Sequence, residues 1–219
     1  DECYFVLQQS GDVEQLADIR ELNKKKGFVM APFLQSDHHP LIVIRPDITA
    51  YDWDEISEAI SSLECADALL TCKNQTEKLS PFVSEETDKE RYTQAFERFI
   101  TPLQKKHFQK LVLSRSSTKH INDDFSPLAA FVRACNNYPR MMIYLCHTPV
   151  SGTWVGSTPE ILLSGHGKEW HTVALAGTMP MQNEVMPMDW DKKNQDEQGY
   201  VADYIRRIIK KFGNKMNEK

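Results

Sequence analysis

The sequence predicts an α+β fold, in which helices pack against an antiparallel sheet. Four short apolar runs follow one another between residues 141 and 178, separated by short loops, as in successive antiparallel strands. Helical periodicity is confined to separate segments, of which residues 92–103 are the clearest. Strands and helices that are grouped, rather than strictly alternating, indicate the α+β class.

The N-terminal part is expected to form strands followed by a helix. Short apolar runs bounded by polar or turn residues predict strands at residues 4–7, 28–33 and 41–45. The pattern becomes helical at 53–63, and the polar, proline-containing stretch 73–84 then interrupts it. We therefore expect an N-terminal lobe, residues 1–80, and a second domain, residues 81–219.

The second domain begins with the clearest helix. One face of that helix carries Tyr92, Ala95, Phe96, Phe99, Ile100 and Leu103. Residues 109–116 (QKLVLSRS) predict a strand that is buried on both sides, because both of its faces are apolar in the middle. Further helices are expected at 126–136, opened by Ser126 and Pro127, and at 194–211.

The four apolar runs predict an antiparallel meander. They are residues 141–147, 152–157, 160–165 and 169–178. The last two carry the sequences EILLSG and EWHTVALAGT. Short Ser, Gly and Pro-containing links between them favour hairpin connections.

Composition excludes several classes of protein. The formal net charge of −5 argues against nucleic acid as a partner, because such binding depends on cationic side chains. No apolar run approaches the roughly 18 residues that span a bilayer, and the first segment has acidic flanks, unlike a signal peptide. The five cysteines are scattered, as expected of reduced thiols. We expect a cytoplasmic protein that binds neither membranes nor nucleic acid.

Three charged residues stand inside or at the entrance of apolar elements: Lys110, Glu160 and Glu197. Each has an ordinary explanation, as a strand-end lysine, an exposed turn acid and an acid at a helix start. Each also has a chemical one. A lysine amine that is partly removed from water can act as a base, and a carboxyl group so placed can donate a proton. A carboxylate such as Glu197 can bind a hard cation such as Mg²⁺.

Four motifs together resemble the chorismate-utilising enzymes. They are KLVLSR (110–115), GSTPEILL (156–163), ALAGT (174–178) and DEQGYVADYI (196–205). Their order and approximate spacing match the family, and four linked motifs are far more specific than one. The resemblance covers about residues 88–209, and its closest members are the isochorismate synthases.

The resemblance implies a role for each of these positions. Lys110 matches the base that activates water for attack at C2 of chorismate, and Glu160 matches the acid that protonates the departing C4 hydroxyl. Glu197 matches a carboxylate that holds Mg²⁺, which binds the carboxylate on the substrate's ring. Ala176, Gly177 and Thr178 match the substrate-binding loop, in which Gly177 and Thr178 contact this carboxylate through backbone and hydroxyl donors. Chorismate is thus the implied substrate, and Mg²⁺ the implied cofactor.

Two positions favour one member of the family over its siblings. Aminodeoxychorismate synthases carry a nucleophilic lysine where this sequence has Ala176, and ammonia-using enzymes such as anthranilate synthase generally lack the lysine that Lys110 matches. Both features suit isochorismate synthase, and salicylate synthase shares them. Gln198 departs from the family, where a histidine is common. The product's pathway, menaquinone or siderophore biosynthesis, stays open.

The family's second metal carboxylate, a later histidine and arginine and a closing glycine-rich segment have no counterpart before Lys219. We therefore expect a truncated chain, with about half of the family's two-sheet fold. We expect these 219 residues alone to convert no chorismate, and to self-associate through exposed apolar surface.

A reading of another class stays open. The chain could be a non-catalytic α+β domain that binds a ligand or protein, with Lys110, Glu160 and Glu197 as ordinary surface groups. Lys110 and Glu160 facing one another across a common cavity would favour the enzyme, and side chains that point to separate surfaces would rule it out.

Overall fold

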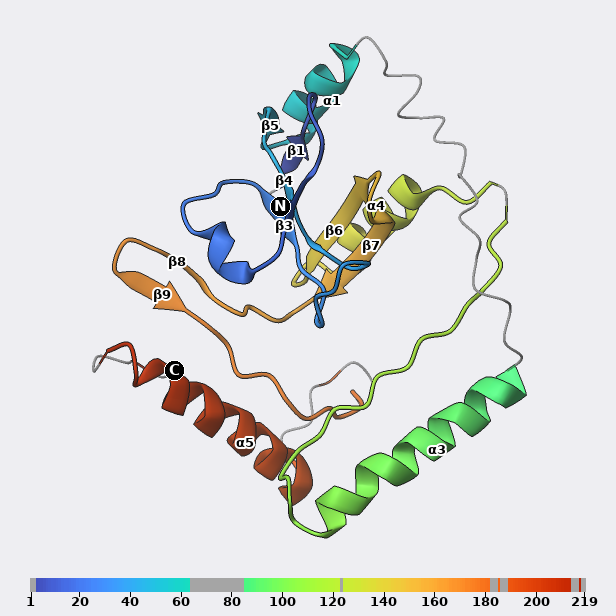
Figure 1. Cartoon of the computed structure of the whole chain (residues 1–219), viewed down its shortest axis with the longest axis vertical. Coiled ribbons are helices and arrows are strands. Elements are labelled where there is room, and N and C mark those ends of the chain that lie inside the picture. The colour runs from blue at the N-terminus through green and yellow to red at the C-terminus, as the bar shows by residue number, and fades with distance from the viewer. Residues whose placement is uncertain are drawn as a thin grey trace. The chain divides into compact units, whose positions relative to one another are not determined.

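A computed structural model describes residues 3–63, 85–122, 124–181, 185, 189–213 and 217 (Figure 1). The chain divides into two compact units, residues 1–78 with 124–158 and residues 79–123 with 159–219. The described elements are α-helices and small antiparallel sheets, which confirms the predicted α+β class. In the part of the chain that the structure describes, no helix has the length and apolar character needed to cross a membrane.

The first unit is built around β4 (Leu41–Ile44), which lies between β2 (Glu14–Leu16) and β3 (Phe28–Met30) in an antiparallel sheet. β4 is an unbroken apolar run with three consecutive buried residues, so side chains on both of its faces are covered. Leu41 and Val43 form the core of this sheet with Leu16 of β2.

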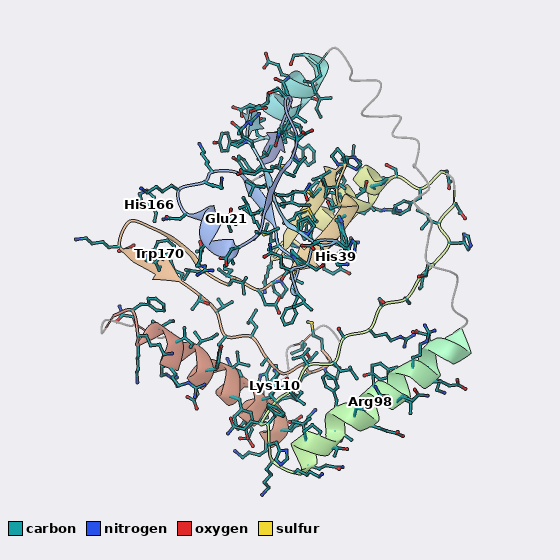
Figure 2. The ribbon with its side chains drawn as sticks, in the orientation of Figure 1. Glu21, His39, Arg98, Lys110, His166 and Trp170 are labelled. Carbon is teal, nitrogen blue, oxygen red and sulfur yellow. The ribbon has the colours of Figure 1, made fainter. Side chains whose placement is uncertain are left out.

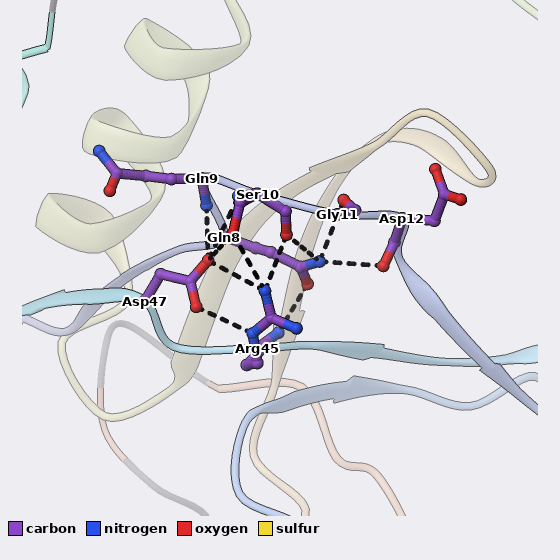
Figure 3. Close-up of polar contacts among 7 residues, drawn as sticks. All are labelled: Gln8, Gln9, Ser10, Gly11, Asp12, Arg45 and Asp47. Atoms are coloured by element: carbon purple, nitrogen blue, oxygen red, sulfur yellow. Dashed lines mark hydrogen bonds and ion pairs between the residues drawn. The ribbon is translucent and has the colours of Figure 1, made fainter.

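A second, two-stranded sheet pairs β1 (Phe5–Leu7) with β5 (Ile48–Ala50). A polar network connects the chain after β1 with the turn between β4 and β5 (Figure 3). Arg45 Nε donates to Asp47 Oδ1 at 2.9 Å, and Asp47 Oδ2 accepts from the backbone N–H of Gln9 at 3.0 Å. The Arg45 side chain also donates to the Ser10 carbonyl at 2.8 Å. The network fixes the exit of β1 against the turn.

Capping residues set the helices of this unit. The Asp52 carboxylate accepts from the N–H groups of Asp54 and Glu55, and α1 (Trp53–Ser61) begins there. The Ser126 hydroxyl caps α4 (Pro127–Asn137) in the same way, as the sequence predicts. Helix α4 packs on the hairpin of β6 (Met142–Thr148) and β7 (Gly152–Thr158).

The second unit holds α3 (Glu85–Gln104), the hairpin of β8 (Ser164–His166) and β9 (Glu169–His171), and α5 (Lys192–Ile209). Helix α3 continues past Pro102 by two residues. The segment that follows α3 contacts this helix through Arg115, whose Nε donates to Asp88 at 2.8 Å.

Three strand predictions are wrong in whole or in part. Residues 109–116, including Lys110, form no strand, and in the runs 160–165 and 169–178 only β8 and β9 are paired. A strand exists only where a neighbour completes its hydrogen-bond ladder. The described residues provide no such neighbour for these segments, and Val112 and Leu162 are 75% and 92% exposed. The predicted meander is therefore two separate hairpins.

The other described elements lie where the sequence predicts them, although α3 begins seven residues before the predicted stripe. Three short elements were not anticipated, the strands β2 and β5 and the 3-10 helix η1 (Ile19–Leu22). The predicted domain boundary near residue 80 lies outside the described residues, so that boundary stays a prediction.

Candidate active site

The start of α5 organises the candidate site. Asp191 is the N-cap, and its Oδ1 accepts from the backbone N–H of Asn194 at 2.8 Å. This cap begins the helix at Lys192, earlier than the predicted Asn194. Spacings of three and four residues place Asn194, Glu197 and Gln198 on one side of its first turns.

The ALAGT segment lies against this side of α5. Gln198 Nε2 donates to the Ala174 carbonyl at 2.7 Å, and the Thr178 N–H donates to Asn194 Oδ1 at 3.2 Å. Between these contacts, the Gly177 N–H donates to the Glu197 carboxylate. The segment is therefore held to α5 at Ala174, Gly177 and Thr178, and Ala176 lies between these contacts.

Lys110 completes this arrangement from a distant part of the sequence. Its Nζ donates to Glu197 Oε1 at 2.9 Å, across 87 residues of chain. Lys110 is labelled in Figure 2. The two side chains are 29% and 32% exposed, so the pair is half-buried. The structure thus brings together the predicted base and the predicted metal ligand, beside the predicted substrate loop.

Glu197 is the electrostatic centre of this cluster. The hydrogen bond from Lys110 lowers the pKa of Glu197, and the positive charge of Lys110 and the Gly177 N–H act in the same direction. Glu197 is therefore ionised at neutral pH. An ionised carboxylate of this kind is a ligand for a hard cation.

The Gly177–Thr178 turn uses its backbone donors within the cluster, since the Gly177 N–H donates to Glu197 and the Thr178 N–H donates to Asn194. The Thr178 hydroxyl takes no part in these contacts. Of the donors expected in this turn, it is the one left for a ligand. The contact of this turn with a substrate carboxylate stays a prediction.

Glu160 lies between β7 and β8, in a stretch that forms no strand, and its side chain is exposed. The expected partial burial of this carboxyl group at the head of a strand is therefore wrong. Its role as an acid stays a prediction.

The residues Asp191, Asn194 and Gln198 were not identified as positioning groups from the sequence. A signal was present for Asp191, since an Asp that directly precedes a helical segment is a common N-cap residue. Gln198 stands out only as a departure from the family histidine. Its amide suits the contact with Ala174, because it offers an N–H donor without a charge.

Magnesium binding can be judged from the donors present. No group of three His, Cys, Asp or Glu side chains that could hold a metal occurs among the residues described. Mg²⁺ typically uses one or two protein carboxylates and keeps several waters. A single carboxylate such as Glu197 fits that pattern.

Comparison with known proteins identifies the family. A sequence model of the chorismate-binding enzymes matches residues 23–219, nearly the whole chain. No curated protein and no solved structure matches the chain. The chain belongs to the chorismate-binding enzyme family, and its substrate class is chorismate.

Proposed function

We propose that the chain carries the active site of an isochorismate synthase, which adds water at C2 of chorismate and removes the C4 hydroxyl. The observation that supports this proposal is the 2.9 Å contact between Lys110 and Glu197, beside the Gly177–Thr178 turn. Within the family, a lysine at this position distinguishes enzymes that use water from those that use ammonia.

The proposed chemistry assigns a role to each group. Lys110 is the base that accepts a proton from water as the water oxygen bonds to C2. The ring double bonds shift, the bond from C4 to its hydroxyl breaks, and Glu160 donates the proton that lets the hydroxyl leave as water. The atoms balance, so the product is an isomer of the substrate.

Glu197 is the residue that would hold Mg²⁺. When bound there, the cation supplies positive charge for the carboxylates of the substrate. Lys110 Nζ contacts the same carboxylate at 2.9 Å. The Thr178 hydroxyl is placed to donate to a substrate carboxylate.

Turnover in H₂¹⁸O tests this proposal in the complete protein. We expect isochorismate that carries one ¹⁸O atom at C2. Salicylate with pyruvate would instead identify a salicylate synthase, and anthranilate formed with ammonia would identify an ammonia-using sibling. If chorismate binds without conversion, the non-catalytic alternative is favoured.

Variants of the same protein test the assigned roles. We expect Lys110→Ala and Glu160→Gln each to reduce turnover by at least about 100-fold, the usual contribution of a general acid or base. Lys192→Ala is the matched control, since Lys192 is an exposed lysine that pairs with Asp196 on the same helix. Near-normal turnover in either of the first two variants would refute the role of that residue.

A further inference from the structure

The Asn194 side chain connects two parts of the candidate site. Its Oδ1 accepts from the Thr178 N–H at 3.2 Å, while its Nδ2 donates to Asp191 Oδ2 at 2.8 Å. Asn194 is only 8% exposed, and buried polar residues are uncommon among the residues described. Because water has little access, a group that loses its partner here is not readily solvated.

Asn194 also packs closely on the preceding residue of the turn. Gly177 has a φ of +75°, and a Cβ atom at this position would lie 3.0 Å from Asn194 Oδ1. Asn194 therefore touches both residues of the Gly177–Thr178 turn, one through packing and the other through a hydrogen bond.

We propose that Asn194 is a positioning residue, which fixes the Gly177–Thr178 turn so that the Thr178 hydroxyl is held ready for a carboxylate of chorismate. This inference rests on the proposed function, because it assumes that the turn meets the substrate. Asn194 acts through Thr178 and does not itself touch the substrate.

An amide is the group that this position requires. It offers an acceptor to Thr178 and a donor to Asp191 at the same time. A carboxylate at position 194 would keep the acceptor but would place a second negative charge against Asp191. Exchanging the two residue types restores one donor and one acceptor, since an asparagine at 191 can still cap the helix.

Three variants test this inference: Asn194→Asp, the exchanged pair Asp191→Asn with Asn194→Asp, and Gln195→Glu as a control. The control adds a negative charge at the next position of α5, where Gln195 is on the exposed side. Chorismate affinity is measured by ligand-observed NMR with Mg²⁺ present. The Thr178 amide is followed by its ¹⁵N–¹H shift and its exchange with solvent.

We expect Asn194→Asp to bind chorismate about tenfold more weakly, as the loss of a buried hydrogen bond predicts. The Thr178 amide should shift and exchange faster in this variant. The exchanged pair should recover both properties to within about threefold, and Gln195→Glu should leave both unchanged. Recovery by the pair separates a specific contact from general damage to the fold.

Two other outcomes are distinguishable. The positioning role is overturned if Asn194→Asp leaves the Thr178 amide or the chorismate affinity unchanged. It is also overturned if the exchanged pair does not recover both properties. In either case the proposed function stands. If the unaltered chain binds no chorismate although the Thr178 amide responds as expected, the proposed function is overturned, and the role of the turn in recognising chorismate falls with it.

Discussion

At the scale of single residues, Glu197 shows how the fold gives chemistry to an ordinary side chain. In the sequence it is one of several acids near a helix start. In the structure it accepts from Lys110 and from the Gly177 N–H, and their contacts hold its pKa below the ordinary range. The sequence pattern placed Glu197 on the correct helix, but the pairing with Lys110 is a long-range contact that periodicity alone cannot predict.

Replacing Gly177 by alanine should destabilise the turn. The φ of +75° is costly for any residue with a Cβ atom, and that atom would press on Asn194. We expect the free energy of unfolding to fall by about 1–2 kcal/mol, measured by urea denaturation. Gly199→Ala is the control, because a Cβ in this part of α5 meets no atom within 4 Å. That change should stabilise the helix by about 0.5–1 kcal/mol. Equal effects of the two substitutions would contradict the described turn.

The network around Asp47 should make the stability of the first unit depend on pH. Hydrogen bonding by Arg45, aided by the Gln9 and Ser10 N–H groups, lowers the pKa of Asp47 from an ordinary 3.8 to about 2. A pKa that is lower in the folded state contributes stability above the ordinary value, and this contribution is lost as the pH falls from about 4 toward 2.

Acid titration of unfolding tests this expectation with Asp47→Asn. The difference in the free energy of unfolding between the unaltered chain and this variant should narrow from pH 5 to pH 2. Asp12→Asn is the control, because Asp12 enters the network through its backbone carbonyl (Figure 3). A difference for Asp47→Asn that does not change with pH would contradict the network.

At the scale of elements, the sequence correctly predicted those helices and strands that are determined by the local pattern of residues. The buried run of β4 and the Ser126 cap of α4 are explicit in the sequence, and both were found. Residues 109–116 carry an equally good strand pattern but form none, because pairing depends on a neighbour that the pattern does not contain. β2 (EQL) and β5 (ITA) were not predicted because, unlike the equally short β1 (FVL) and β3 (FVM), they are not unbroken apolar runs.

The cap of α4 offers a direct test at this scale. Ser126→Ala removes the hydroxyl that accepts from the Ala129 N–H at 3.2 Å. We expect a loss of about 1 kcal/mol in the free energy of unfolding, measured by urea denaturation. Ser126→Asp should keep most of the stability, since aspartate also caps helices. If the alanine variant is as stable as the original, the cap has no energetic role.

At the scale of the whole molecule, membership of the chorismate-binding family and the α+β class agree with the sequence-based expectation. The four linked motifs made the family recognisable. The choice between isochorismate synthase and its siblings depends instead on a few side chains around Lys110. The product that the enzyme forms from chorismate distinguishes these family members.

The exposed apolar side chains of the second unit lead us to expect self-association. Leu162 and Leu163 are 92% and 62% exposed and adjacent. Light scattering should show a mass that rises with concentration, and Leu162→Lys should reduce this rise. Gln104→Lys, which makes the same change of charge at an exposed polar position, should not. A clean monomer at high concentration would contradict this expectation.

The most direct test of the central claim is the binding of chorismate by this chain with and without Mg²⁺. Saturation-transfer NMR detects weak complexes, with dissociation constants near 1 mM and binding free energies of about −4 kcal/mol. We predict binding that strengthens when Mg²⁺ is added, and loss of this Mg²⁺ effect in Glu197→Gln but not in the neighbouring Asp196→Asn. Binding that is indifferent to Mg²⁺, or a Mg²⁺ effect that persists in Glu197→Gln, would contradict the assignment of Glu197 and the site built around it.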